Sequence, residues 1–181
     1  MLAADDIHKS DPNFKLIYGC EAYFVDDMIP CVYGVQDAPL TGEFCVFDTE
    51  TTGLDPNVEY LTEIGGVIVK NGEVVEEFVK PGKPITPKIT ELTGITNEMV
   101  ADAPSEAEAL QAFLDFAGGR ILVAHNAHSF DIRFLRIAAK RSGISFEPTY
   151  IDTLTMAQAM YPGLHNYKQG TINKHLELPS Y

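Results

Sequence analysis

The stretch Glu43–Pro56, EFCVFDTETTGLDP, joins a short apolar run to two acids, two threonines and a glycine. A β-strand places residues i and i+2 on the same face, so Asp48 and Glu50 should point one way while Phe47 and Thr49 point the other. Two carboxylates held side by side repel each other unless a positive charge lies between them. The stretch therefore predicts a strand whose end carries two acids in need of a counter-charge.

The composition is that of an ordinary globular protein. A chain of 181 residues with 45% hydrophobic content can form one well-buried domain with an appendage. No apolar run approaches the roughly 18 residues that cross a membrane, and charges interrupt the start, MLAADDIHKSDPNF, where a signal peptide would be apolar. Cys20, Cys31 and Cys45 form no CxxC pair, which fits a reducing compartment. We expect a cytoplasmic protein with no membrane partner.

The formal net charge of −13 restricts the ways in which this chain can bind nucleic acid. Proteins that bind nucleic acid only by neutralising its phosphates are usually basic, so the charge argues against a stand-alone DNA-binding module. It is compatible with a metal-dependent nuclease, because divalent ions supply positive charge at the scissile phosphate.

The pattern from Phe44 to Pro81 predicts three antiparallel strands. Phe44–Phe47 is a short buried run, and residues 60–81, YLTEIGGVIVKNGEVVEEFVKP, contain two further strand-like runs. Asn71-Gly72 between them favours a two-residue hairpin turn, since both central positions need positive φ.

Beyond Pro81, helical and strand-like segments alternate. A helical turn is expected over Pro87–Leu92, and Ser105 with an acid three residues later predicts the start of a longer helix. The remaining expected elements are a strand in 120–126, a helix in 129–143, a strand in 149–154 and short helices in 153–163 and 168–178. This order predicts an α/β fold whose mixed sheet has an antiparallel three-strand start and is flanked by helices.

Three acids stand at positions where two strands and a helix meet: Asp48, Glu50 and Asp131. If the two strands are neighbours, their carboxylates converge at one edge, and oxygen ligands from separate elements are how Mg²⁺ or Mn²⁺ is held. Two such ions roughly 3.5–4 Å apart can drive phosphodiester hydrolysis. Taken alone, Asp131 is also explained by the dipole of its helix, and the acid pair by a solvated strand edge.

Four segments occur in an informative order: VFDTETTGL (46–54), EIGGVIVKNGEVVEEF (63–78), KPITPKITELTGITNEMV (83–100) and ILVAHNAHSFDIRFL (121–135). Together they resemble the proofreading exonuclease family, which has four metal-binding acids and a catalytic histidine. The resemblance implies a ribonuclease H-like fold over residues 41–181 and metal-dependent 3′→5′ removal of nucleotides. It also implies a two-metal Mg²⁺ or Mn²⁺ site in which Asp48, Glu50 and Asp131 are the catalytic and metal-binding residues.

The resemblance further implies three groups of substrate contacts. The first lies along the terminal nucleotide, the second forms a wall against the terminal base, and the third reaches the substrate strand. In this chain they match, in that order, Thr51, Thr52, Gly53 and Leu54; Thr93, Gly94 and Ile95; and Asn126. Glycine suits the turn at position 53 because it has no side chain to keep a substrate away. Ordinary loop packing explains Leu54 and Ile95 equally well.

Residues 1–40 have strand-like runs but no helix to cover them. The segment NFKLIYGCEAYFVDD (13–27) is similar to the polymerase-and-histidinol-phosphatase-type domain that precedes the exonuclease in C-type bacterial replicative DNA polymerase III. We therefore expect a partial domain and linker, in which Glu21 matches a ligand position but binds nothing alone. The resemblance implies three partners: a single-stranded 3′ end of DNA, the remainder of the polymerase chain and a sliding clamp.

Two features depart from the family pattern. HNAHSFD is one residue longer between Asn126 and Asp131, and we interpret His128 as an exposed loop residue and not as a replacement base. The family's last motif, a histidine followed five residues later by an aspartate, finds no match, since Gly170 follows His165 at that spacing and Ser180 follows His175. We thus expect three of four metal acids, no catalytic base and little activity. A free-standing DNA or RNA exonuclease and a degenerate scaffold domain stay open as alternatives.

Overall fold

A computed structural model of the chain describes residues 29–35, 42–69 and 74–179. Its six-stranded sheet has the order β1-β6-β5-β2-β3-β4. The strands are β1 (Val32–Tyr33), β2 (Phe44–Thr51), β3 (Leu61–Ile68), β4 (Val74–Phe78), β5 (Ile121–Ala124) and β6 (Tyr150–Asp152). β2, β3 and β4 pair antiparallel, while β5 runs parallel to both β2 and β6. The predicted mixed α/β sheet is confirmed.

Strand β2 is longer than the apolar run that predicted it. It continues past Phe47 through both acids to Thr51, because Thr49 and Thr51 are buried on the same face as Phe47. Asp48 therefore lies on the opposite, solvent-facing side of the sheet. The expected turn at Asn71-Gly72 lies outside the described residues.

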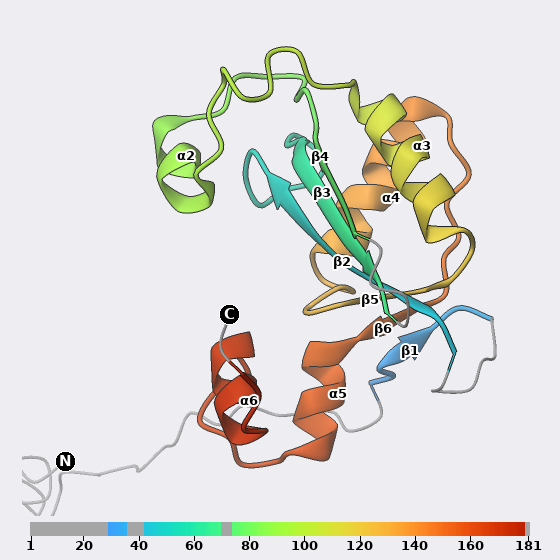
Figure 1. The fold of residues 1–181 in the computed structure, drawn as a ribbon, viewed down its shortest axis with the longest axis vertical. Helices are drawn as coiled ribbons and strands as arrows, with labels where there is room; N and C mark the ends of the chain where they lie inside the picture. Colours follow the sequence, from blue (N-terminus) through green and yellow to red (C-terminus); the bar gives the residue numbers. More distant parts are fainter. Residues whose placement is uncertain (1–28, 36–41, 70–73, 180–181) are drawn as a thin grey trace, which may run out of the picture.

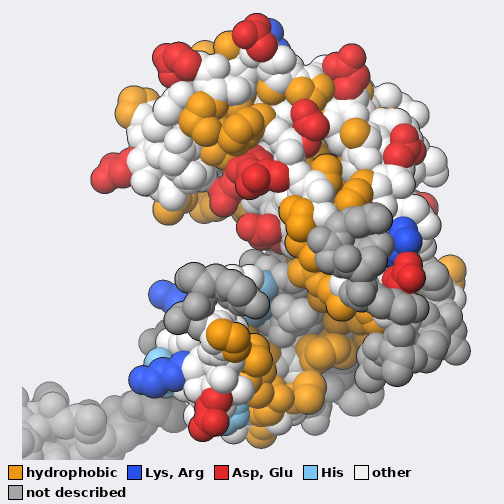
Figure 2. Space-filling view, in the orientation of Figure 1, with side chains coloured by type: hydrophobic (Ala, Val, Ile, Leu, Met, Phe, Trp, Pro, Cys, Tyr) orange, Lys and Arg blue, Asp and Glu red, His pale blue; other side chains and the backbone are white. Residues whose placement is uncertain are grey.

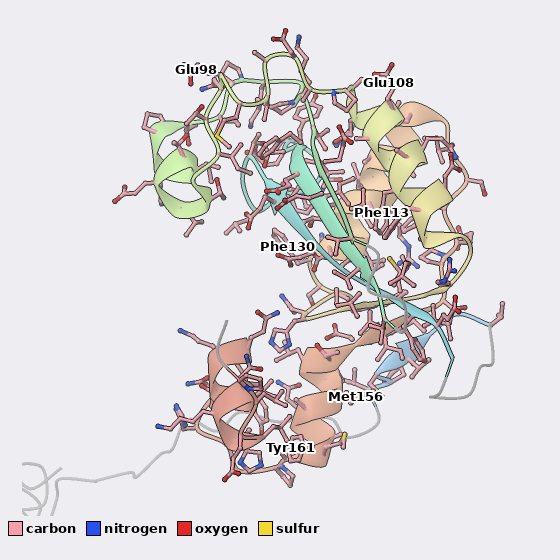
Figure 3. The ribbon with its side chains drawn as sticks, viewed as in Figure 1. Glu98, Glu108, Phe113, Phe130, Met156 and Tyr161 are labelled. Atoms are coloured by element: carbon pink, nitrogen blue, oxygen red, sulfur yellow. The ribbon has the colours of Figure 1, made fainter. Side chains whose placement is uncertain are left out.

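Two helices cover one face of the sheet (Figure 1). They are α3 (Glu106–Ala117) and α4 (Asp131–Ser142), and both contribute buried residues to one core with β2, β3, β5 and β6. Ser105 forms the predicted capping box with Glu108 at the start of α3. Phe113 packs from α3 against Phe47 of the sheet, with ring centroids 5.5 Å apart (Figure 3).

Three shorter helices lie beyond this core (Figure 1). They are α2 (Pro87–Thr93), α5 (Thr153–Met160) and α6 (Gln169–His175). Next to α2, a second small apolar cluster contains Ile85, Ile95 and Val100. Within the described segments, no helix combines the length and apolar character that a membrane span needs.

The edge strand β1 comes from the N-terminal segment that we expected to belong to a separate partial domain. Val32 pairs with Ile151 and Tyr33 with Tyr150, so these two residues extend the sheet beyond β6. Pairing of this kind covers backbone groups that an edge strand otherwise leaves exposed. Residues 1–28, including Glu21, lie outside the described part of the chain.

Candidate active site

Four carboxylates share the open face of the antiparallel strands. Asp48 lies opposite Gly65, which lies opposite Glu76, and Glu50 lies opposite Glu63. Residues paired across a sheet point to the same face, so these side chains surround the bare backbone of Gly65. They line a hollow of about 260 Å³. Figure 2 shows acidic side chains gathered over β2 and β3, beside the recess that separates them from α5 and α6.

These carboxylates crowd one another. Burial raises the pKa of Asp48, and burial together with the Asp48 charge raises the pKa of Glu50. Burial, followed by the interaction with Glu76, raises the pKa of Glu63 to about 7. No lysine or arginine of the described segments forms an ion pair with any of the four. Within the described segments, the charges of this face therefore have no lysine or arginine partner.

Asp131 approaches β2 from the helix-covered side. It is the first residue of α4, is 2% exposed, and accepts a 2.7 Å hydrogen bond on Oδ1 from the Thr49 hydroxyl. Burial raises its pKa to about 6, and the negative charge of Asp48 adds to the increase. Asp48 and Asp131 therefore interact electrostatically, although they lie on opposite sides of β2.

The three predicted metal ligands are close but do not form a closed metal centre. Within the described residues, no three His, Cys, Asp or Glu side chains are grouped tightly enough to hold an ion. The available donors are all carboxylate oxygens, which are the ligands that Mg²⁺ and Mn²⁺ prefer. Their raised pKa values show that the ionised forms lack compensation. The donor set therefore fits a hard divalent cation.

The segment after β2 is held by its own threonines. The Thr51 hydroxyl donates to the Gly53 carbonyl at 2.6 Å, and the Thr52 hydroxyl donates to Glu59. A Cβ at Gly53 would lie 2.7 Å from the Glu59 carboxyl carbon, so Glu59 occupies the space that we expected a substrate to need. Leu54 is 83% exposed and available to a ligand.

The predicted base wall is only partly accessible. Ile95 is 3% exposed and packs on Ile85 and Val100, which agrees with the loop-packing alternative. Gly94 has φ +78° and ends α2, a conformation that favours glycine. The Thr93 hydroxyl donates to Ile89 O at 3.0 Å. Exposed surface here comes from Gly94 and partly from Thr93.

Asn126 lies in the loop between β5 and α4, with a φ of +65° that is unusual for a residue other than glycine. Its backbone N–H donates to Asp152 Oδ1 at 3.1 Å, and the His128 N–H donates to Oδ2 at 2.9 Å. Asp152 is 2% exposed and also accepts from Leu154 N at the start of α5. No motif in the sequence marks this buried carboxylate.

The histidines of the described segments differ in their relation to the acids. The charge of His125 lowers the pKa of Asp48, and the His125 ring contacts Thr153 and the Tyr167 carbonyl. His128 is exposed and hydrogen-bonds to Tyr150, while His175 packs edge-on against Tyr161.

Two acids of the open face, Glu63 and Glu76, were not predicted as site residues. Only the pairing register of the strands would have revealed that they join Asp48 and Glu50.

The sheet order, the acid pair on its central strand and the acid that begins α4 define a ribonuclease H-like nuclease fold. The sequence model of the exonuclease family (RNase T) matches residues 45–180. The chain belongs to this exonuclease family. Enzymes of the family generally depend on divalent metal ions.

Curated relatives at high identity are DNA polymerases. DNA polymerase III PolC-type from Caldanaerobacter subterraneus is 48% identical over 167 residues, covering 91% of this chain and 12% of that protein. The Thermotoga maritima protein of the same name is 41% identical over 174 residues, covering 93% of this chain and 13% of that protein. The chain thus spans about an eighth of the length of these relatives.

Two solved exonuclease structures resemble this fold. Exonuclease X in complex with 5′ overhanging duplex DNA has a TM-score of 0.58 and 28% identity, covering 76% of this chain and 75% of that one. Product-bound exonuclease I has a TM-score of 0.66 at 16% identity, covering 77% of this chain and 39% of that one. The second likeness shows the fold alone.

Proposed function

We propose that this chain is the 3′→5′ proofreading exonuclease domain of a PolC-type replicative DNA polymerase III, acting on single-stranded 3′ ends of DNA. The observation that carries the proposal is the crowding of Asp48 and Glu50 beside Asp131, with no ion pair to a lysine or arginine of the described segments. Membership of the exonuclease family and 48% identity to a PolC-type polymerase support it.

Asp48, Glu50 and Asp131 would together hold two Mg²⁺ or Mn²⁺ ions. When bound, such ions activate the attacking water and stabilise the leaving oxygen of the phosphodiester. Asp48 and Glu50 present their carboxylates on the open face of β2. The Thr49 hydroxyl fixes one oxygen of Asp131 and, by favouring its ionised form, prepares the carboxylate to act as a ligand.

The substrate strand would cross the edge at which β2 and β5 end. These neighbouring strands are parallel, so the segments that follow them lie at the same edge of the sheet. Exposed Leu54 follows β2 and Asn126 follows β5, which supports the proposal that both contact the substrate near the acids. Gly53, Thr93 and Gly94 would contribute surface to the substrate. Buried Thr51 and Thr52 would hold the turn through their hydroxyls, and Ile95 would support the wall from beneath.

A metal titration combined with a hydrolysis assay tests this proposal. We expect Mn²⁺ to bind the chain, measured by calorimetry or electron paramagnetic resonance, and Asp48→Asn to abolish binding. A labelled primer with a 3′ mismatch should lose nucleotides from that end only with metal present. The control Asp55→Asn changes an exposed aspartate after the turn and should leave both results unchanged. A preference for RNA over DNA ends would instead support a free-standing RNA exonuclease.

A scaffold role without catalysis is favoured by one observation, the lack of a closed three-ligand group among the described residues. Failure of the wild-type chain to bind Mn²⁺ would support that role. The remainder of the polymerase chain and a sliding clamp are proposed as further partners, since the chain spans only 12% of its relatives. Residues 1–40 are proposed to be the linker and partial domain that connect it to that remainder.

A further inference from the structure

The loop between Asn126 and Asp131 contains His128, whose ring has a defined environment. His128 Nδ1 lies 2.7 Å from the Tyr150 hydroxyl, and the two rings are nearly coplanar, at 18°, with centroids 6.2 Å apart. They therefore lie side by side, joined by a hydrogen bond. Tyr33 of β1 stacks across both rings, at 4.3 Å from His128 and 4.7 Å from Tyr150. Aromatic rings stacked at such distances attract each other beyond the burial of their surface.

The same N-terminal segment contacts the loop by a second route. The Asp152 backbone N–H donates to the Cys31 carbonyl at 2.8 Å. The Asp152 carboxylate in turn accepts from the backbone of Asn126 and His128. Residues 31–33 thus hold the loop through a ring stack and through strand β6.

The loop needs such support for two reasons. Asn126 has φ +65°, a conformation that costs energy for a side-chain-bearing residue and persists only when its surroundings impose it. At the other end, Phe130, labelled in Figure 3, precedes α4, and no side chain caps the start of the helix that carries Asp131. A shift of this loop would move both residues.

We propose that Tyr33 is a positioning residue for the loop of residues 125–130, and through it for Asn126 and Asp131. This inference rests on the proposed function of that site. The family model matches residues 45–180, and Tyr33 lies before that region. A residue outside the matched region would therefore help to shape the site. The simpler alternative is that β1 only covers the edge of β6.

Val32 provides the matched control for edge cover. It shares the two-residue strand and its backbone pairing with Tyr33, but its side chain points to the other face and is 49% exposed. Replacing Val32 by alanine therefore tests strand pairing without touching the rings. Tyr33→Phe retains the stack, because the stack uses the ring and not the hydroxyl.

The experiment compares Tyr33→Ala, Tyr33→Leu, Tyr33→Phe and Val32→Ala by amide hydrogen exchange and Mn²⁺ titration. For Tyr33→Ala and Tyr33→Leu we expect about tenfold faster exchange at Asn126 and His128 and a Mn²⁺ dissociation constant raised about three- to tenfold. Tyr33→Phe and Val32→Ala should match the wild type. Exchange at Leu110 in α3 should stay constant, which separates loop opening from global unfolding.

Two results would overturn the inference: equal exchange acceleration at Leu110 and the loop, or an unchanged loop in Tyr33→Ala and Tyr33→Leu. If the wild type binds no Mn²⁺, the proposed function fails. The exchange data still decide whether Tyr33 positions the loop.

Discussion

The two halves of the sheet treat their carboxylates in opposite ways. In the antiparallel half, β2–β4, Asp48, Glu50, Glu63 and Glu76 share an open face and form no ion pair with a lysine or arginine of the described segments. In the parallel half, the buried Asp152 is surrounded by backbone N–H donors. Backbone donors of the chain itself compensate the charge of Asp152. The acids of the antiparallel half are left for a ligand. A site for an external cation is expected where internal satisfaction is lacking.

The largest expected effect is on activity in the antiparallel half. In a longer chain that includes the family's last motif, Asp48→Asn should lower the hydrolysis rate about a thousandfold, since metal-based charge stabilisation supplies several kcal/mol. The unfolding free energy of the metal-free chain should not fall, because the change removes a charge that burial disfavours. Hydrolysis of a labelled primer and urea denaturation measure the two quantities. A strongly destabilised variant would remove the contrast between the halves.

The corresponding change in the parallel half should act on stability. Asp152→Asn replaces one acceptor oxygen by an amide group, so backbone N–H groups of the loop and α5 lose their partner. We therefore expect the unfolding free energy to fall by about 2–4 kcal/mol. Urea denaturation measures the loss. Asp102→Asn, at an exposed turn position, is the control and should change stability little. Equal losses in the two variants would show that Asp152 is not a structural carboxylate.

Thr49 connects the two halves of the sheet, and the loss of stability on removing its hydroxyl should depend on pH. Thr49→Val deletes the hydroxyl that stabilises ionised Asp131, so the pKa of Asp131 should rise further above about 6. The loss of unfolding free energy should be about 1–2 kcal/mol at pH 8 and smaller at pH 5, where Asp131 is protonated in both proteins. Mn²⁺ affinity should begin to fall at a higher pH than in the wild type.

Thr51→Val is the matched control for this change. Thr51 is buried on the same face of β2, and its hydroxyl donates to the Gly53 carbonyl, which does not titrate. Its cost should therefore be the same at pH 5 and pH 8. A pH-independent cost for Thr49→Val would contradict the assigned link to Asp131.

The smallest expected effect is a gain in stability. Glu76→Gln removes the neighbour that helps to raise the pKa of Glu63 to about 7. Between its unfolded value of 4.5 and 7, native Glu63 retains a proton that the unfolded chain releases, so wild-type stability falls as pH rises through this window. In Glu76→Gln the unfolding free energy should depend less on pH in this window. It should exceed the wild-type value by at most about 1 kcal/mol at pH 8, because solvent screens the repulsion between Glu63 and Glu76.

Glu77→Gln serves as the control on the same strand. Glu77 lies opposite Ile64 and so points to the other face of the sheet. The unfolding free energy of Glu77→Gln should change with pH between 4.5 and 7 as that of the wild type does. Thermal unfolding across this range measures both variants.

Local sequence signals predicted most elements of the fold. The capping box at Ser105 and the left-handed Gly118 and Gly143 set the limits of α3 and α4, as the pattern indicated. Strand pairing was harder to predict. A two-residue turn at Asn71-Gly72 would put Glu63 opposite Lys80, but Glu63 lies opposite Phe78. The prediction of β2 also stopped too early, because Thr49 and Thr51 are polar residues buried by α4 and by their own hydrogen bonds.

The sequence by itself determined the order of strands and helices and the placement of Asp48 and Glu50 on one face, because periodicity and capping act over a few residues. Only the tertiary structure decided which distant side chains join them. Strand register brought Glu63 and Glu76 to the acid face, helix packing placed Asp131 against Thr49, and edge pairing laid Tyr33 over His128. These contacts depend on how separate elements pack, which no local pattern specifies.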